Sequence, residues 1–275
     1  MSHLTRIGNP NVFATLPFDQ IDGFAGGYVH DDFIQAITVA DYVDASGGAA
    51  QLSDQNWRGT EIAAGAAVGN SLVLPGVADH AGILQIQTGG TTPADGDGVA
   101  IQFGATIGST QDTLVLDNNG VYIACVARIL DVSDQNFEFG LGGAQPVEAN
   151  ASSADMVSCV FDPADASNVS DELFFAQANI ATVDSEVVGA LTYVEADWFL
   201  AEVGVSDTSM NVRITTEDAT ETLEIVATMP TVALRPVIST TNIGAAEELL
   251  DIDLFHMRYL RRDSLTGNGS DWLGQ

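Results

Sequence analysis

The last third of the chain alternates hydrophobic and polar residues over short segments that are separated by small polar turns. These segments cover residues 188–194, 198–205, 210–215, 221–226 and 249–260. A period of two is typical of a strand that buries one face. Strands that follow one another with so little between them indicate antiparallel pairing. The pattern therefore predicts an all-β fold, an antiparallel β-sandwich of the jelly-roll type.

The middle of the chain shows the same alternation, over residues 83–87, 99–103, 137–141, 156–161 and 173–177. Asn119 and Gly120 separate two apolar runs, and because Asn-Gly adopts the positive φ of a type I′ turn, we predict a two-residue hairpin there. Pro236 predicts an edge strand or a bulge, since proline cannot donate a hydrogen bond to a β-ladder. The acidic loop that begins with Asp162 and Pro163 is expected to be exposed.

The first 28 residues mix prolines and glycines with scattered aromatic and aliphatic residues. This mixture is too apolar for a disordered tail and too irregular for a regular element, so we predict an extended N-terminal arm. Phe13, Leu16, Phe18 and Phe24 are the expected anchors of the arm on a neighbouring molecule. Packing of the arm on its own sandwich remains the alternative. The predicted organisation is an arm over 1–28, a sandwich over 29–262 and a C-terminal tail over 263–275.

The chain has 38 acidic and 8 basic residues, a formal net charge of −30, and no lysine. Nucleic-acid binding requires cations that displace condensed counterions, so this charge argues against DNA or RNA as a partner and also against anionic membranes. No apolar run reaches the roughly 18 residues of a membrane span, and the start lacks a signal-peptide pattern, which favours folding in a cytoplasm. Cys125 and Cys159 lie in apolar runs and are expected to be free, buried thiols.

No group of residues has the spacing of a catalytic or metal site, so we expect no enzyme activity, no metal and no cofactor. Asp251 and Asp253 occupy alternate positions of one strand and would share a face; an ion pair beside Arg261 or a strand-end turn explains them. Asp95 and Asp97 in a glycine-rich loop could hold calcium, and an ordinary acidic turn is the alternative.

Aromatic side chains matter because sugars stack on aromatic faces. The candidates are Trp57, Tyr193, Trp198 and Trp272. Trp198 lies in an alternating strand and is expected in the core. Trp57 with its neighbour Arg58 is expected at the surface, and these two and Trp272 are, with the arm anchors, the candidate contacts for a partner.

Six segments in order resemble the concanavalin-A-like lectin and glucanase jelly roll: VYIACVARI, FEFGLGG, WFLAEVGV, NVRITT, LRPVIST and IDLFHMRYL. The resemblance covers residues 30–262, and VADHAGILQIQTG resembles this domain as it occurs in virion proteins of tailed bacteriophages. The glucanases of this superfamily place Glu-x-Asp-x-x-Glu on one strand. The chain lacks that pattern, which agrees with the absence of catalysis.

The resemblance implies a non-enzymatic virion structural protein, made in the host cytoplasm. The expected role is a capsid decoration or cement protein, a homo-oligomer that binds the phage major capsid protein or other virion proteins. A carbohydrate-binding or receptor-binding tail or fibre protein that contacts a host glycan is the alternative, and a divergent glycan-degrading enzyme is the third hypothesis.

Overall fold

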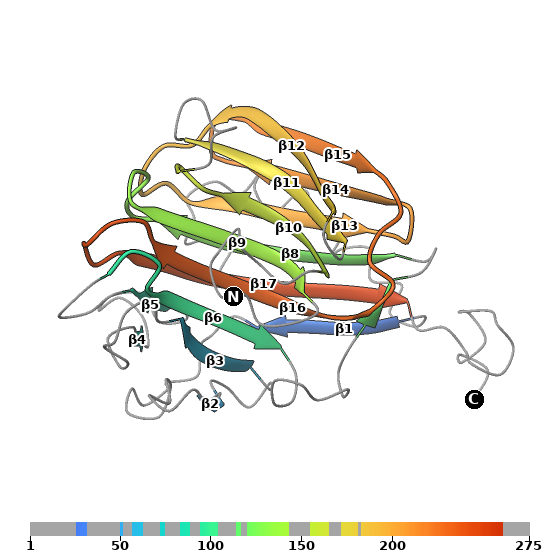
Figure 1. Ribbon diagram of the computed structural model, residues 1–275, viewed down its shortest axis with the longest axis horizontal. Coiled ribbons are helices and arrows are strands. Elements are labelled where there is room, and N and C mark those ends of the chain that lie inside the picture. The colour runs from blue at the N-terminus through green and yellow to red at the C-terminus, as the bar shows by residue number, and fades with distance from the viewer. Residues whose placement is uncertain are drawn as a thin grey trace, which may run out of the picture.

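The computed structural model describes residues 26–31, 50–51, 57–62, 72–74, 83–88, 94–103, 114–116, 120–142, 155–164, 172–180 and 183–260. They form two antiparallel sheets that pack face to face around one apolar core, and strands of the two sheets overlie one another in Figure 1. The predicted all-β sandwich is confirmed.

Sheet A has the strand order β15-β14-β13-β8-β17-β5-β4, and β1 pairs with β17 beside β5. The bounds are β1 Gly26–Asp31, β4 Leu72–Leu74, β5 Leu84–Gln87, β8 Val121–Ile129, β13 Phe199–Val205, β14 Ser209–Thr215, β15 Thr220–Val226 and β17 Leu249–Leu260.

Sheet B has the order β12-β11-β10-β9-β16-β6-β3-β2, and β7 pairs with β16. The bounds are β2 Ala50–Gln51, β3 Trp57–Ile62, β6 Gly98–Phe103, β7 Leu114–Val115, β9 Gln135–Gly142, β10 Asp155–Phe161, β11 Leu173–Ile180, β12 Val183–Thr192 and β16 Ala233–Asn242.

Aromatic pairs join the two sheets through the core. Phe137 of β9 meets Phe199 of β13 edge to face at 5.3 Å between ring centroids, and Phe139 meets Phe255 of β17 at 6.3 Å. Such pairs add about 1 kcal/mol each to the burial of the rings. Cys125 and Cys159 are buried and free, as predicted.

The predicted hairpin at Asn119 and Gly120 is wrong. β7 before it pairs with β16 of sheet B, whereas β8 after it is paired on its two sides with β13 and β17 of sheet A. The chain therefore crosses between the sheets here. Gly120 does have the positive φ that the prediction required, 77°. An apolar run, a turn and a second apolar run have the same pattern whether the second strand pairs with the first or crosses to the other sheet.

Two further local predictions need correction. Pro236 does not lie in an edge strand, because β16 pairs with β9 on one side and with β7 and β6 on the other. It follows the two residues paired to β7 and precedes Val237, where the pairing to β6 begins, so the proline coincides with a break in that ladder. Asp162 and Pro163 are buried rather than exposed, and Asp162 Oδ1 accepts the amide of Ala164 at 2.9 Å.

The predicted arm lies almost entirely outside the described residues, as do its anchors Phe13, Leu16, Phe18 and Phe24 and the tail residue Trp272. β1 begins at Gly26, within the last residues assigned to the arm. In the part of the chain that the structure describes, no helix has the length and apolar character needed to cross a membrane.

Candidate functional site

A stripe of polar side chains crosses the outer face of sheet B. Phe137 and Phe139 of β9 belong to the core, so alternation turns Glu138 between them to the opposite face. Outward side chains that are paired in register or hydrogen-bonded to one another continue this row across five adjacent strands. We call the set the polar stripe; from β12 to β16 it consists of Asp184, Gln177, Ser158, Glu138 and Ser239.

Hydrogen bonds link parts of the polar stripe. Ser158 Oγ donates to Glu138 Oε1 at 3.1 Å, and Gln177 Nε2 donates to Asp184 Oδ2 at 3.3 Å. Ser239 is the register partner of Glu138. Burial decreases along the stripe, from the fully buried Glu138 and Ser158 through Gln177 to the exposed Asp184. The stripe therefore reaches solvent at its β12 end.

Several polar atoms on this face have no hydrogen-bond partner. They are Glu138 Oε2 and Gln177 Oε1 in the stripe, and Asn136 Oδ1 one outward position before Glu138 on β9. The Ser239 hydroxyl lies near enough to Glu138 to lower its carboxyl pKa, yet it forms no hydrogen bond of ordinary geometry. A buried polar atom without a partner costs about 1–3 kcal/mol, so an unfilled acceptor row needs an explanation.

The surroundings of Glu138 favour its protonated form. Complete burial raises the pKa of its carboxyl well above the usual value, and the hydroxyls of Ser158 and Ser239 offset this only in part. A protonated carboxyl offers a donor as well as acceptors. In its protonated form Glu138 lets the centre of the stripe both give and receive hydrogen bonds.

Gly140 leaves a gap in the side chains beside the stripe. It lies opposite Ser158 on β10 and Val237 on β16. A Cβ at this position would come within 2.1 Å of the Val157 carbonyl oxygen, so no larger residue fits without moving the backbone.

The outer face of sheet A carries ion pairs. Arg128 donates to Asp251 Oδ2, and Gln85 Nε2 donates to Asp251 Oδ1 at 2.7 Å. Farther along this face, Glu202 accepts from Tyr122 and Arg213. Burial raises the pKa of Glu202, although both of these hydrogen bonds oppose the shift.

The aromatic candidates for sugar stacking are engaged elsewhere. Tyr193 is 1% exposed, packs in the core, and its hydroxyl donates to the carbonyl of Asp197 at 2.6 Å. Trp198 is not in the core as predicted: it is partly exposed on the outer face of sheet A, with the Arg128 guanidinium 4.8 Å from its ring centroid. Trp57 and Arg58 lie in β3 and are paired with Phe103 and Gln102 of β6. Their side chains are not among those that the structure describes.

Asp251 and Asp253 do not share a face as a simple strand would require. The register shifts between Ile252 and Leu254, so the alternation breaks at Asp253. Asp251 pairs with Arg128, whereas Asp253 lies near enough to the Cys125 thiol to raise its pKa, after the larger effect of burial. Arg261, the predicted partner, lies outside the described residues.

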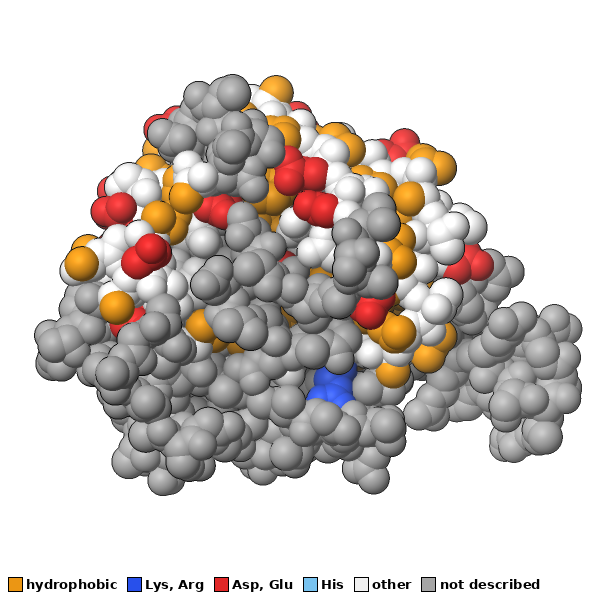
Figure 2. Space-filling model, in the orientation of Figure 1, with side chains coloured by type: hydrophobic (Ala, Val, Ile, Leu, Met, Phe, Trp, Pro, Cys, Tyr) orange, Lys and Arg blue, Asp and Glu red, His pale blue; other side chains and the backbone are white. Residues whose placement is uncertain are grey.

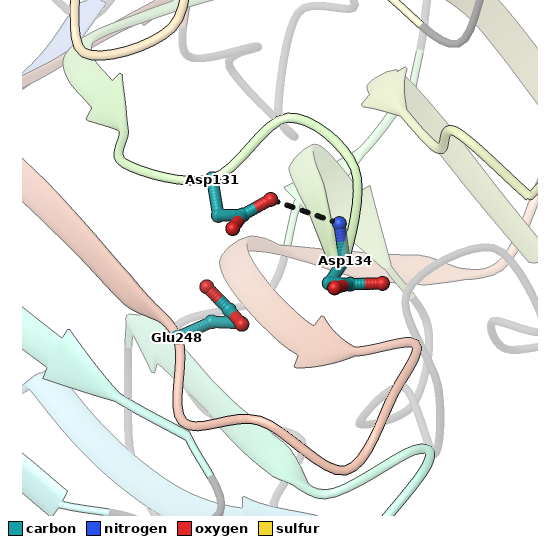
Figure 3. Close-up of side chains that lie close together, drawn as sticks. All are labelled: Asp131, Asp134 and Glu248. Carbon is teal, nitrogen blue, oxygen red and sulfur yellow. Dashed lines mark hydrogen bonds between the residues drawn. The ribbon is translucent and has the colours of Figure 1, made fainter.

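Three carboxylates that the sequence did not single out converge at one end of the sandwich. Figure 3 shows Glu248, from the loop between β16 and β17, beside Asp131 and Asp134 of the loop between β8 and β9. One carboxylate oxygen from each lies within 4.8 Å of one from each of the others. We call this group the acid corner. By contrast, Asp97 accepts the Ala94 amide at 2.9 Å as in an ordinary turn, and Asp95 is exposed.

Comparison of the sequence with protein-family models and with curated proteins finds no match. Three of the solved structures that share the fold do so over 86% of this chain. One is a Shewanella oneidensis MR-1 protein of unknown function, at 11% identity, 88% of its own length and a TM-score of 0.54. Winged bean acidic lectin, complexed with methyl-α-D-galactose, is 8% identical, is covered over 98% of its own length and has a TM-score of 0.54. The lectin UEA-II, complexed with galactose, is 10% identical, is covered over 99% of its own length and has a TM-score of 0.51.

The fold is therefore that of the legume lectins, a concanavalin-A-like jelly roll. At these identities the likeness establishes the fold alone. It does not test the expected bacteriophage origin.

Proposed function

We propose that the protein binds an uncharged carbohydrate along the polar stripe on the outer face of sheet B. The observation that carries the proposal is the row of buried acceptor atoms without donors, on Asn136, Glu138 and Gln177. Binding sites for small molecules place a few such polar groups in a buried setting.

A sugar matches the hydrogen-bonding capacity of the stripe. Each sugar hydroxyl both donates and accepts, so it can satisfy the unpartnered acceptors and can also accept a hydrogen bond from the protonated form of Glu138. The net charge of −30 disfavours an anionic glycan. Figure 2 shows Asp and Glu side chains spread over the visible face among hydrophobic and other side chains, which adds to that repulsion.

The two lectins of the same fold support the proposal, because both were solved with a galactose-type sugar. We extend it to binding without hydrolysis. Glycoside hydrolysis uses two carboxyl groups about 5–10 Å apart. Glu138 has Asn136 and Gly140 beside it on β9 and Ser158 and Val160 on β10, and Asp162 after β10, a carboxyl near enough to raise its pKa, is held by the Ala164 amide.

The test is an array of neutral glycans, followed by titration calorimetry with the best binder. Gln177→Ala removes an unpartnered acceptor and should weaken binding at least about tenfold, since a lost hydrogen bond in a buried site costs on the order of 1.5 kcal/mol. Thr222→Ala, at an exposed position of β15, is the matched control and should bind like the wild type. Failure of the wild type to bind any neutral glycan, or equal affinity of Gln177→Ala, would refute the proposal.

The capsid decoration role implied by the sequence resemblance stays a prediction. Its test is the presence of this polypeptide in purified particles and its position in their reconstruction.

Deletion of residues 2–24 would test the arm: loss of oligomer or particle binding at an unchanged melting temperature supports a contact arm, whereas a destabilised monomer assigns the segment to the domain's own core. Glycan binding and a virion location are compatible, since a receptor-binding virion protein needs both.

A further inference from the structure

We propose that the outer face of sheet B selects an N-acetylated sugar, a neutral sugar that carries an acetamido group. The inference rests on the proposed function. It adds the chemical group that the central part of the polar stripe recognises and the apolar residues that contact this group.

The two side-chain amides on this face have their donors bound within the protein. Asn136 Nδ2 donates to Thr241 Oγ1 at 3.3 Å, and Gln177 Nε2 donates to Asp184 Oδ2 at 3.3 Å. These bonds fix the orientation of both amides, and they leave Asn136 Oδ1 and Gln177 Oε1 as acceptors without a donor. A ligand that lies over this face must therefore supply hydrogen-bond donors.

Glu138 offers an acceptor and, in its protonated form, a donor. Ser158 Oγ donates to its Oε1, and Oε2 has no partner. Complete burial favours protonation, because it raises the pKa of this carboxyl well above the usual value. A protonated carboxyl donates through its O–H and accepts through its oxygens. An amide, with one N–H donor and one carbonyl acceptor, has the complementary pair.

A row of apolar side chains begins directly beside Glu138. From Glu138 toward the sheet edge, the successive register partners are Val160 of β10, Phe175 of β11 and Val188 of β12. We call these three residues the apolar row. The residues before and after Val160 and Phe175 belong to the core, so alternation turns both side chains to the outer face. Both are fully buried, yet neither belongs to an apolar cluster of the described residues.

The polar stripe and the apolar row run side by side. Gln177 follows Phe175 by one outward position on β11, and Ser158 precedes Val160 by one on β10, a spacing of about 7 Å along a strand. A ligand at Glu138 therefore meets acceptors on one side and apolar side chains on the other. A hydroxyl group supplies the donor alone. An acetamido group supplies an N–H, a carbonyl and a methyl group within one small planar unit.

A sugar with a free amine also offers donors, and the net charge of −30 would attract it. Its ammonium group would, however, lie next to Val160 and Phe175, where a buried charge is unfavourable without a partner of opposite sign. The protonated form of Glu138 is not such a partner. The acetamido group avoids this cost because it is neutral.

The test is calorimetric titration of the full chain with matched neutral disaccharides, N,N′-diacetylchitobiose against cellobiose and N-acetyllactosamine against lactose. In at least one pair the acetylated sugar should bind about tenfold more tightly, because it adds a hydrogen bond and a buried methyl group. Chitobiose, which has free amines, should bind more weakly than its acetylated form. Tighter binding of chitobiose would mean that charge rather than the acetamido group selects the ligand, which contradicts the proposal.

Val160→Thr tests the apolar row, because it keeps the shape of the side chain and replaces a methyl group with a hydroxyl group. It should weaken binding of the acetylated sugar several-fold and narrow the difference within the pair. Val226→Thr makes the same change at a side chain that is 77% exposed, and it should bind like the wild type. Thermal melts without ligand establish that both variants are folded, and the wild-type comparison within each pair does not depend on either variant.

The outcomes separate this inference from the proposed function. Equal affinity within both pairs, or no binding of the acetylated sugars by a chain that binds other neutral glycans, would overturn the selection of an acetamido group and leave glycan binding in place. Failure to bind any neutral glycan would overturn both.

Discussion

At the residue scale, two glycines, one just before β8 and one in β13, differ in what a side chain would meet. Gly120, before β8, has a φ of 77°, and a Cβ there would lie 3.2 Å from the Val205 carbonyl oxygen. Gly204, in β13, has open space where its Cβ would be. A side chain should therefore have opposite consequences at the two positions.

Gly120→Val should destabilise the fold by about 1–2 kcal/mol, because a β-branched residue is strained at positive φ. Gly204→Ala is the control and should leave stability unchanged or slightly raised. Urea unfolding of the three proteins measures both effects. An unchanged unfolding midpoint for Gly120→Val would show that the backbone at this position is not held at positive φ.

Glu248 predicts a pH dependence in the absence of metal. Burial and the neighbouring carboxylates raise its pKa from 4.5 to about 7 in the folded chain. Below pH 4.5 the group is protonated in both states; between pH 4.5 and 7 the unfolded chain releases the proton while the folded chain keeps it, so stability falls as pH rises.

In EDTA the wild type should therefore lose stability relative to Glu248→Gln between pH 4.5 and 7, and the difference should level off above pH 7. Melting curves across this range measure the difference. Parallel pH profiles for the two proteins would mean that Glu248 has an ordinary carboxyl pKa.

At the element scale, the edge of β12 is closed by a side chain of the opposite sheet. Glu221 of β15 accepts the amides of Ala190 and Leu191 at 2.8 and 2.9 Å, in the place where a neighbouring strand would offer carbonyls. Gly189 makes room for this contact, since a Cβ there would lie 2.5 Å from Glu221 Oε2. Unpaired edge amides are sites for pairing with other chains, so Glu221 protects β12 as well as linking the two sheets.

Glu221→Ala should lower stability by about 1 kcal/mol and speed amide hydrogen exchange at residues 190 and 191. Glu224→Ala, on the exposed face of the same strand, is the control and should do neither. Hydrogen exchange followed by mass spectrometry resolves this segment. Unchanged exchange in Glu221→Ala would exclude the capping role.

Strand positions were largely predictable at this scale, because alternation and turn chemistry are local. The predicted strand over 249–260 is β17 itself, and the turn before β14 is closed as expected, with Ser206 Oγ accepting the Ser209 amide at 3.2 Å. The sheet to which a strand belongs was not predictable, as β7 and β8 show. Alternation reveals that a strand has one face in the core, but it does not reveal in which of the two sheets the strand lies.

The candidate site was hidden from the sequence for a related reason. Glu138 and Gln177 alternate with apolar residues, which is the pattern of positions that face water, yet they are buried. The one local signal was the run of glycines after Glu138 in FEFGLGG, which marks a strand with few outward side chains. Asp131 and Glu248 are brought together by tertiary structure alone, and no spacing reveals such a pair.

At the scale of the whole molecule, charge sets the response to salt. With a net charge of −30 the folded chain repels itself, and at about 0.1 M salt charges beyond about 10 Å are screened from one another. Raising NaCl from about 20 mM to 500 mM in EDTA should therefore raise the melting temperature. A melting temperature that falls or stays level would show that the acidic residues are already balanced by local contacts.

The position of β17 affects how the protein is made. This last of the described strands lies inside sheet A, with β8 along one side and both β5 and β1 along the other. While a ribosome is still translating residues before 249, β8 and β1 have no common partner, and the earliest described strand must wait for the latest one. Sheet A can therefore be completed only once β17 has been synthesised, and a nascent chain stalled before residue 249 should be sensitive to protease where the 275-residue chain resists it.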